Sequence, residues 1–210
     1  MELKSLITGP LQQICYLLWN DPQRTLVIDP GAEAERIGQF IKDRDLNVAA
    51  FICTHGHTDH IGALADLHRF FPAPILIHSA DLSWAFELVN HLFPIHGVPE
   101  RPINADYIPL EDAEKWPRDL PAFQCIETPG HTPGSCCLFF HEEQLLISGD
   151  TLFRGTYGRT DLPGGNPREM TNSLQKLKQL PDTTRVYPGH GPHTTIGTEK
   201  ATNPFFGVYW

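Results

Sequence analysis

Short apolar runs rich in β-branched and large aliphatic residues recur along the chain and are bounded by Gly, Pro, Asn and Asp clusters. Such runs predict β-strands. In chain order they cover residues 3–7, 14–19, 25–28, 48–53, 74–78, 123–128, 135–140, 144–148 and 185–187. The run 48–53 shows no polar alternation, so we expect this strand to be covered on both faces.

Two segments between the early strands have helical spacing. In residues 33–43, Ile37, Phe40 and Ile41 stand at i, i+3 and i+4, which predicts a helix with one apolar face. A second helix is predicted after residue 60, with Leu64, Leu67 and Phe70 on its buried side.

Two further helices are predicted from their first residues. Ser79 is the expected N-cap of a helix that continues to about residue 90. Asn166, Pro167 and Glu169 supply an N-cap, a proline at the first helical position and a glutamate two residues later. This second helix is expected to keep its apolar face as far as Leu180.

The order of these elements predicts an α+β protein with two mixed sheets packed face to face and helices outside. A single domain over residues 1–210 is expected, because this length suits one core. The Pro-rich stretch 91–121 is interpreted as an extended surface segment, and 151–166 as a Gly-rich loop. The tail after residue 191 is expected to pack back through residues 203–206.

Charge and composition exclude several classes of function. The formal charge is −9 and no run of basic residues occurs, which argues against nucleic-acid binding. No apolar stretch is long enough to span a membrane, and no signal peptide is recognised, so a cytoplasmic location is expected. Five cysteines without C-x-x-C spacing predict buried, reduced thiols rather than a disulfide framework.

Four turns that carry histidine or aspartate fall just after predicted strand ends, where a rigid sheet can bring side chains together. The candidate metal ligands are His55, His57, Asp59, His60, His131, Asp150 and His190. Three imidazoles and a carboxylate within residues 55–60 exceed what one tetrahedral ion needs, which indicates two metal ions. His193 competes with His190, which is favoured because it lies in the tight Pro-Gly-His-Gly turn.

These turns read Thr-His-Gly-His-Thr-Asp-His, Pro-Gly-His-Thr-Pro-Gly, Ser-Gly-Asp-Thr-Leu-Phe and Tyr-Pro-Gly-His-Gly-Pro. In this order they resemble the metallo-β-lactamase superfamily, and most of all the short bacterial members of its glyoxalase II group. The resemblance implies an αββα four-layer sandwich. It also implies that His55, His57 and His131 hold one metal ion, that Asp59, His60 and His190 hold a second, and that Asp150 bridges them. Zinc is the expected metal, with iron or manganese as alternatives.

The resemblance implies a hydrolase of methylglyoxal detoxification. Its expected substrate is a small anionic thioester, S-D-lactoylglutathione or a related hydroxyacyl-glutathione, attacked by a hydroxide that bridges the two ions. Asp59 is the candidate that orients this nucleophile and takes its proton.

Four more residues are given supporting roles. Asp29, Thr54 and Thr128 are candidate hydrogen-bond partners that orient the imidazoles, although β-propensity alone also explains the two threonines. Arg159 is a candidate for binding a carboxylate of glutathione, and a surface ion pair with Asp161 is the alternative.

Other functions stay open at this point. A glutathione persulfide dioxygenase uses one non-haem iron held by two histidines and one aspartate, and the complete second set of ligands argues against it. A lactonase or a broader thioesterase is a further alternative. A non-catalytic metal-binding module is also considered, and a β-lactamase is disfavoured because those enzymes lack an aspartate at the position of Asp150.

Overall fold

The structure is a computed structural model, and it describes residues 1–90 and 97–206. The chain divides into two compact units, Met1–Pro121 and Ala122–Trp210. Each unit is built around one mixed sheet, as the sequence predicts. The expectation that the whole chain is one domain stays a prediction.

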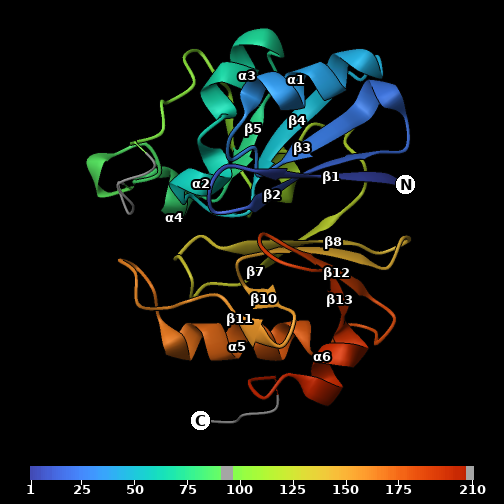
Figure 1. Cartoon of the computed structure of the whole chain (residues 1–210), viewed down its shortest axis with the longest axis vertical. Helices are drawn as coiled ribbons and strands as arrows, with labels where there is room; N and C mark the ends of the chain where they lie inside the picture. Colours follow the sequence, from blue (N-terminus) through green and yellow to red (C-terminus); the bar gives the residue numbers. More distant parts are fainter. Residues whose placement is uncertain (91–96, 207–210) are drawn as a thin grey trace. The chain divides into compact units, whose positions relative to one another are not determined.

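Unit one contains a sheet of six strands in the order β1-β2-β3-β4-β5-β6 (Figure 1). Its strands are β1 Glu2–Thr8, β2 Gln13–Trp19, β3 Thr25–Ile28, β4 Val48–Cys53, β5 Ile75–Ile77 and β6 Tyr107–Pro109. The first three strands are antiparallel, and β3 to β6 run parallel to one another. The carboxyl ends of β3, β4 and β5 therefore lie along one edge of the sheet, where ligands usually bind in open α/β sheets.

Helices α1 (Ala34–Asp43) and α3 (Leu64–Phe70) lie side by side over one face of this sheet (Figure 1). Ile37, Ile41 and Leu67 on the helices share a core with Leu17 and Phe51 on the strands. Each of these side chains is fully buried, and burial of one such side chain contributes about 2 kcal/mol. This core fixes the strand ends from which the functional turns emerge.

The prediction for Phe70 is wrong. Its side chain is 68% exposed, with the Lys42 ammonium 5.3 Å from the ring centre. At 100° per residue, Leu64, Leu67 and Phe71 form the inward stripe, and Phe70 lies beyond its margin. Phe71 accordingly packs against the core in its place.

The predicted helix over residues 79–90 is much shorter in the structure. Helix α4 covers Ser79–Leu82, and a 3-10 turn, Leu88–Asn90, follows after a series of turns. Its N-cap is His78, not Ser79, because the imidazole Nδ1 accepts the amide of Ala80 at 3.1 Å. Three further short helical segments are the 3-10 turn Pro22–Arg24 before β3, helix α2 (Thr58–Ile61) after β4, and the 3-10 turn Ala113–Lys115 after β6.

The interpretation of residues 91–121 as an extended segment is wrong in part. Residues 91–96 lie outside the described residues, but β6 adds a parallel strand to the sheet beside β5. This strand is only three residues long and half-buried, so it lacks the continuous apolar run by which a strand is recognised.

Unit two contains a sheet of five strands in the order β13-β12-β9-β8-β7 and a separate two-stranded ribbon, β10-β11 (Figure 1). Its strands are β7 Gln124–Glu127, β8 Cys136–Phe140, β9 Leu145–Gly149, β10 Leu152–Phe153, β11 Thr156–Tyr157, β12 Arg185–Pro188 and β13 Thr194–Thr195. Strands β9 and β12 are parallel, and the other pairs are antiparallel. The ribbon lies inside the segment that was expected to be a loop.

Helices α5 (Pro167–Leu177) and α6 (Ile196–Thr202) complete unit two. The predicted cap of α5 is confirmed: Asn166 Oδ1 accepts the amides of Arg168 and Glu169 at 3.0 and 3.2 Å. The helix ends at Leu177, and residues up to Leu180 continue only as turns.

The core of unit two confirms that the tail packs back. Met170, Leu174 and Leu177 of α5 pack with β-strand residues that include Leu146 and Val186, and Phe206 joins the same core at 1% exposure. The sequence did not predict β13 or α6, because the run 194–202 has neither a clear period nor a long apolar stretch.

Four of the five cysteines are buried, and Cys125 is half-buried. Burial raises the pKa of Cys137 to about 12, and it raises the thiol pKa values of Cys15 and Cys53 as well. These buried thiols stay protonated at neutral pH and are poor nucleophiles. Among the residues that the structure describes, no helix combines the length and apolar character that a membrane crossing requires.

Candidate metal centre

Unit one presents its predicted ligands on the turn that follows β4 and opens α2. His55, His57, Asp59 and His60 are all buried there. The ring centres of His55 and His60 are 4.0 Å apart, and those of His55 and His57 are 4.9 Å apart. Asp59 Oδ2 lies 3.9 Å from His60 Nε2. Three imidazoles and a carboxylate thus converge at the carboxyl end of one buried strand.

Asp29 organises this cluster from the end of the neighbouring strand β3. Its Oδ1 accepts the amide of Thr54 at 2.7 Å, and its Oδ2 accepts the Thr54 hydroxyl at 2.6 Å. The same Oδ2 lies 3.0 Å from His60 Nδ1. Asp29 has a left-handed backbone, φ 51°, which is uncommon for a residue with a side chain and marks this position as specially constrained.

These contacts set the tautomers of two histidines. An ionised Asp29 only accepts hydrogen bonds, so His60 carries its proton on Nδ1. The Thr54 hydroxyl donates to Asp29 and therefore accepts from His55 Nδ1, which is 3.2 Å away. In both rings the Nε2 lone pair is left as the donor for a metal, which is the usual arrangement of metal-binding histidines. The roles predicted for Asp29 and Thr54 agree with these contacts.

Sequence reasoning missed two residues that hold the backbone between His55 and His57. Asp81 Oδ2 accepts the amide of Gly56 at 2.8 Å, and Asn90 Nδ2 donates to the carbonyl of the same glycine at 2.7 Å. Both side chains are fully buried. In the sequence, Asp81 and Asn90 are only polar residues within a stretch that was predicted to be helical. Nothing local indicates that their partner is the backbone of Gly56.

Gly31 is a third missed residue. An added Cβ would lie 1.6 Å from the carbonyl oxygen of Asp59, so the chain after β3 passes directly against the backbone of the histidine-rich turn. Only glycine permits this approach, because the clashing atom belongs to backbone that cannot rotate away.

Unit two presents its own predicted ligands at one sheet edge. Asp150 follows β9 and His190 follows β12, and these parallel strands pair Gly149 with Pro188 at their ends. Asp150 Oδ2 lies 3.6 Å from His131 Nε2 and 3.7 Å from His190 Nε2. One carboxylate oxygen is therefore flanked by two imidazole nitrogens.

The chain after β11 orients His131. The Nδ1 of this histidine is 2.7 Å from the carbonyl oxygen of Arg159, so Nδ1 carries the proton and Nε2 faces Asp150. Gly158 lies against the backbone of Asp150, where an added Cβ would approach the Asp150 carbonyl oxygen to 1.7 Å. Neither the Arg159 carbonyl nor Gly158 was predicted to have this role.

The structure separates His190 from its competitor His193. His193 stacks on the ring of Tyr187, with ring centres 5.9 Å apart. His190 instead points its Nε2 to Asp150, and its ring is in edge contact with Phe153 at 6.3 Å. Within unit two the geometry favours His190 as the ligand.

Thr128 has a contact other than the predicted one, and Arg159 forms the ion pair that was its alternative. The Thr128 hydroxyl is 2.8 Å from the Thr151 hydroxyl, so it ties the His131 turn to the Asp150 turn and does not orient an imidazole. The Arg159 guanidinium forms a two-point ion pair with Asp161 at 2.7 and 2.8 Å. This hydrogen bonding lowers the pKa of Asp161 to about 2, so the pair stays charged at neutral pH.

The donor set in each unit fits divalent metal ions. Imidazole nitrogens and carboxylate oxygens suit zinc, iron and manganese. Neither group of predicted ligands contains a cysteine. In unit one, hydrogen bonds at Nδ1 direct His55 and His60, and in unit two they direct His131. Such outer partners tune and orient metal ligands.

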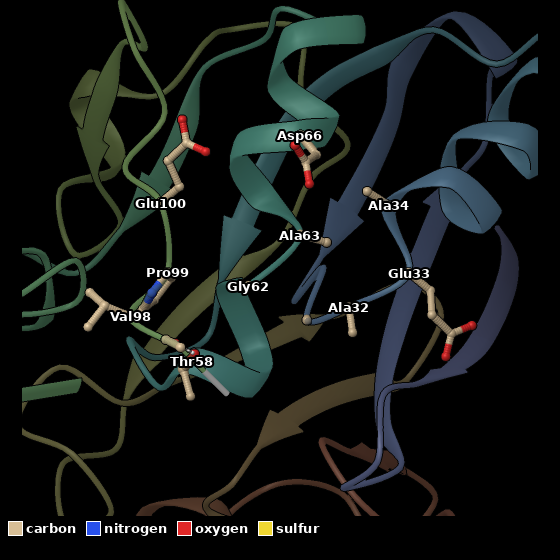
Figure 2. A pocket seen from close by; sticks show the side chains of 12 residues that line it. Ala32, Glu33, Ala34, Thr58, Gly62, Ala63, Asp66, Val98, Pro99 and Glu100 are labelled. Carbon is tan, nitrogen blue, oxygen red and sulfur yellow. Dashed lines mark hydrogen bonds between the residues drawn. The ribbon is translucent and has the colours of Figure 1, made fainter. Parts of the chain in front are cut away.

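A separate pocket of about 290 Å³ lies in unit one, between the start of α1, the α2–α3 turn and residues 97–100 (Figure 2). Figure 2 shows the carboxylates of Glu33, Asp66 and Glu100 around it. Glu33 pairs with Arg36, and Asp66 and Glu100 both pair with Arg69. Residues 55, 57, 59 and 60 do not line this pocket, and its three carboxylates are ion-paired with the two arginines.

The chain matches the family model "Metallo-beta-lactamase superfamily" over residues 8–190. It therefore belongs to this superfamily. Its fold is the metallo-beta-lactamase fold of the α+β class, so the predicted fold class is confirmed.

Two curated relatives match the chain over nearly all of both lengths. "Probable metallo-hydrolase YqgX" of Bacillus subtilis is 37% identical over 100% of this chain and 99% of the relative. "Hydroxyacylglutathione hydrolase GloC" of Haemophilus influenzae is also 37% identical, over 98% of each chain.

Two solved structures are similar as well. The B3 metallo-beta-lactamase BLEG-1 superposes with a TM-score of 0.88 at 34% identity, over 99% of this chain and 100% of the other. TTHA1623 in a di-iron-bound form superposes with a TM-score of 0.84 at 38% identity, over 96% of this chain and 99% of the other.

Proposed function

We propose that this protein is a metal-dependent hydrolase whose two ligand groups together hold two divalent ions. His55, His57 and His131 would bind the first ion, and Asp59, His60 and His190 the second. Asp150 would be their shared ligand, because a single oxygen of this carboxylate already stands between two imidazole Nε2 atoms. This position of Asp150 is the observation on which the proposal depends most. The di-iron-bound relative supports a centre with two metals.

Bound ions would supply Lewis acidity and lower the pKa of a coordinated water towards 7. The chain's own residues would do the rest. Asp59, a buried carboxylate beside His60, would orient the attacking water and accept its proton. Asp29 and the Arg159 carbonyl would keep His60 and His131 in the required tautomers throughout the reaction.

The proposed substrate is a small anionic thioester linked to glutathione, such as S-D-lactoylglutathione. The relative named as a hydroxyacylglutathione hydrolase supports this choice at 37% identity over almost the full length. Hydrolysis would release a hydroxy acid and the free thiol. The complete ligand set also favours hydrolysis over the mononuclear iron chemistry of a persulfide dioxygenase, which needs only two histidines and one carboxylate.

Turnover of S-D-lactoylglutathione and elemental analysis on the same purified sample test the proposal. We expect thioester cleavage by protein that carries two ions per chain, and the analysis identifies those ions. The control measures oxygen uptake with glutathione persulfide. Oxygen uptake faster than thioester cleavage, preferential cleavage of a lactone or β-lactam, or one ion per chain in an active sample would each contradict it.

Arg159 is proposed to bind a carboxylate of the substrate. The carboxylate of Asp161 already binds the Arg159 guanidinium and would compete with the substrate, so substitutions at both positions test this role. We expect Arg159→Met to raise the KM for the thioester about tenfold and Asp161→Asn to lower it, since the second change frees the guanidinium. Both variants should keep kcat and the bound metal close to wild type. Steady-state kinetics at pH 7 are the measurement, because the ion pair is fully charged there.

Opposite shifts of KM are the result that a surface ion pair alone does not produce. An exposed pair of this kind contributes little to folding, so neither variant should alter the thermal transition. If KM is the same in both variants, Arg159 has only the structural contact with Asp161.

A further inference from the structure

Glu199 is a fully buried carboxylate on α6, outside the four turns that carry the predicted ligands. Its Oε1 accepts the Thr194 hydroxyl at 2.6 Å. Its Oε2 accepts the amide of Gly155 and the Nδ2 group of Asn203, both at 2.8 Å. Burying an ionised carboxylate is costly unless such hydrogen bonds compensate, so this arrangement indicates a specific role.

The partners of Glu199 belong to different segments of unit two. Thr194 opens β13, Asn203 caps α6, and Gly155 is at the turn of the β10–β11 ribbon. Asn203 Nδ2 also donates to the carbonyl of Thr156 at 3.1 Å. Glu199 and Asn203 therefore hold two consecutive residues of the ribbon, Gly155 in its turn and Thr156 at the start of β11, and we call this pair the ribbon clamp.

The ribbon is directly connected to three predicted metal ligands. Phe153 on β10 contacts the ring of His190. Immediately after β11, the amide of Gly158 donates to the carbonyl of Thr151, the residue after Asp150. The next residue, Arg159, accepts the hydrogen bond from His131 Nδ1. A shift of the ribbon would therefore disturb His131, Asp150 and His190 together.

We propose that Glu199 is a positioning residue for the metal ligands of unit two and acts on them through the ribbon. This inference rests on the proposed function, because it assumes that these ligands hold metal. It concerns the hydrogen bonds of the clamp and not its charge. An amide in place of the carboxylate can offer its oxygen to Gly155 and Asn203 and its NH₂ group to the Thr194 hydroxyl, which also accepts.

The experiment compares Glu199→Ala, Glu199→Gln and the wild type by titration of the metal-free proteins with Co²⁺. The visible absorption of Co²⁺ reports the number and geometry of its ligands without any substrate. We expect Glu199→Ala to bind Co²⁺ about 10- to 100-fold more weakly and with an altered spectrum. Glu199→Gln should restore both to wild-type values, which a general loss of packing would not explain.

Two further variants keep the test decisive. Lys200→Met removes the contacts of α6 with Asp182 and Leu180 but none with the ribbon, so it should leave the Co²⁺ spectrum unchanged. If Glu199→Ala does not fold, Asn203→Ala removes the bond to Thr156 and should weaken Co²⁺ binding in the same direction. Hydrogen exchange should also become faster at residues 152–159 in Glu199→Ala and Asn203→Ala, but not in Glu199→Gln.

An unchanged Co²⁺ spectrum and affinity in Glu199→Ala would overturn the inference, as would an equal loss in Lys200→Met or no rescue by glutamine. These outcomes leave the proposed function intact if the wild type binds two ions. A wild-type protein that takes up no Co²⁺ would instead refute the metal centre, and the inference with it.

Discussion

Replacement of Asp150 with asparagine is expected to abolish the metal-dependent reaction. Asp150 Oδ2 stands within 3.7 Å of two imidazole Nε2 atoms, those of His131 and His190. An amide has the same shape but carries no negative charge, and its nitrogen does not bind metal. The change therefore tests the ligand chemistry with little change in packing.

We expect Asp150→Asn to lose more than about 100-fold in thioester turnover, because loss of even an outer partner of a metal ligand costs up to that factor. The bound metal should fall from two ions per chain to one or fewer. Elemental analysis and kcat/KM with S-D-lactoylglutathione are the measurements. Circular dichroism should match the wild type, since the substitution adds no heavy atom to the site.

Asp182→Asn is the matched control for the loss of one carboxylate. Asp182 is exposed, and its side chain pairs with Lys200 at 2.6 Å. This variant should keep the full metal content and turnover. If Asp150→Asn also kept two ions and full turnover, Asp150 would not be the shared ligand, and the proposed centre would have to be abandoned.

The ligand turns were predictable because their residue types are chemically distinctive and follow strand ends. Residues 55–60 hold three histidines and an aspartate, residue types that an apolar core does not require, and parallel strands place Asp150 and His190 at one edge. The partners that orient these ligands were harder to find. Asp81 and Asn90 act on Gly56 across more than 24 residues of sequence, and Arg159 acts through a backbone carbonyl that carries no residue-specific signal.

The same distinction applies to the fold. Strands such as β3 and β4 and the cap of α5 were predicted closely, because local side chains determine them. The helix over residues 79–90 was overestimated because Asp81 and Asn90 turn their side chains to the Gly56 backbone, and this tertiary contact overrides helix propensity. The short strands β6, β10 and β11 follow from pairing with neighbours, which a sequence period cannot reveal.

Gly158→Ala is expected to lower the stability strongly. The added Cβ would lie 1.7 Å from the carbonyl oxygen of Asp150 and 2.8 Å from its carbonyl carbon. Both atoms are backbone, so no side-chain rotation relieves the clash. We expect the free energy of unfolding to fall by about 4 kcal/mol or more. Single substitutions cause losses of this size only by specific mechanisms, such as a steric clash that the backbone cannot relieve. Co²⁺ binding should fall as well, since Asp150 and His131 both lie against this glycine.

Gly155→Ala separates this steric effect from ordinary backbone strain. Gly155 has φ +77°, and no heavy atom outside its neighbours lies within 4 Å of an added Cβ. Alanine there should cost only about 1 to 2 kcal/mol, from the left-handed backbone alone. Urea unfolding of the two variants, together with Co²⁺ titration, gives the comparison. If Gly158→Ala were as stable as Gly155→Ala and kept its metal, close contact with Asp150 would not be what positions this ligand. The ribbon clamp would then lose one of its routes to the metal ligands, because the chain from the ribbon to His131 passes through Gly158.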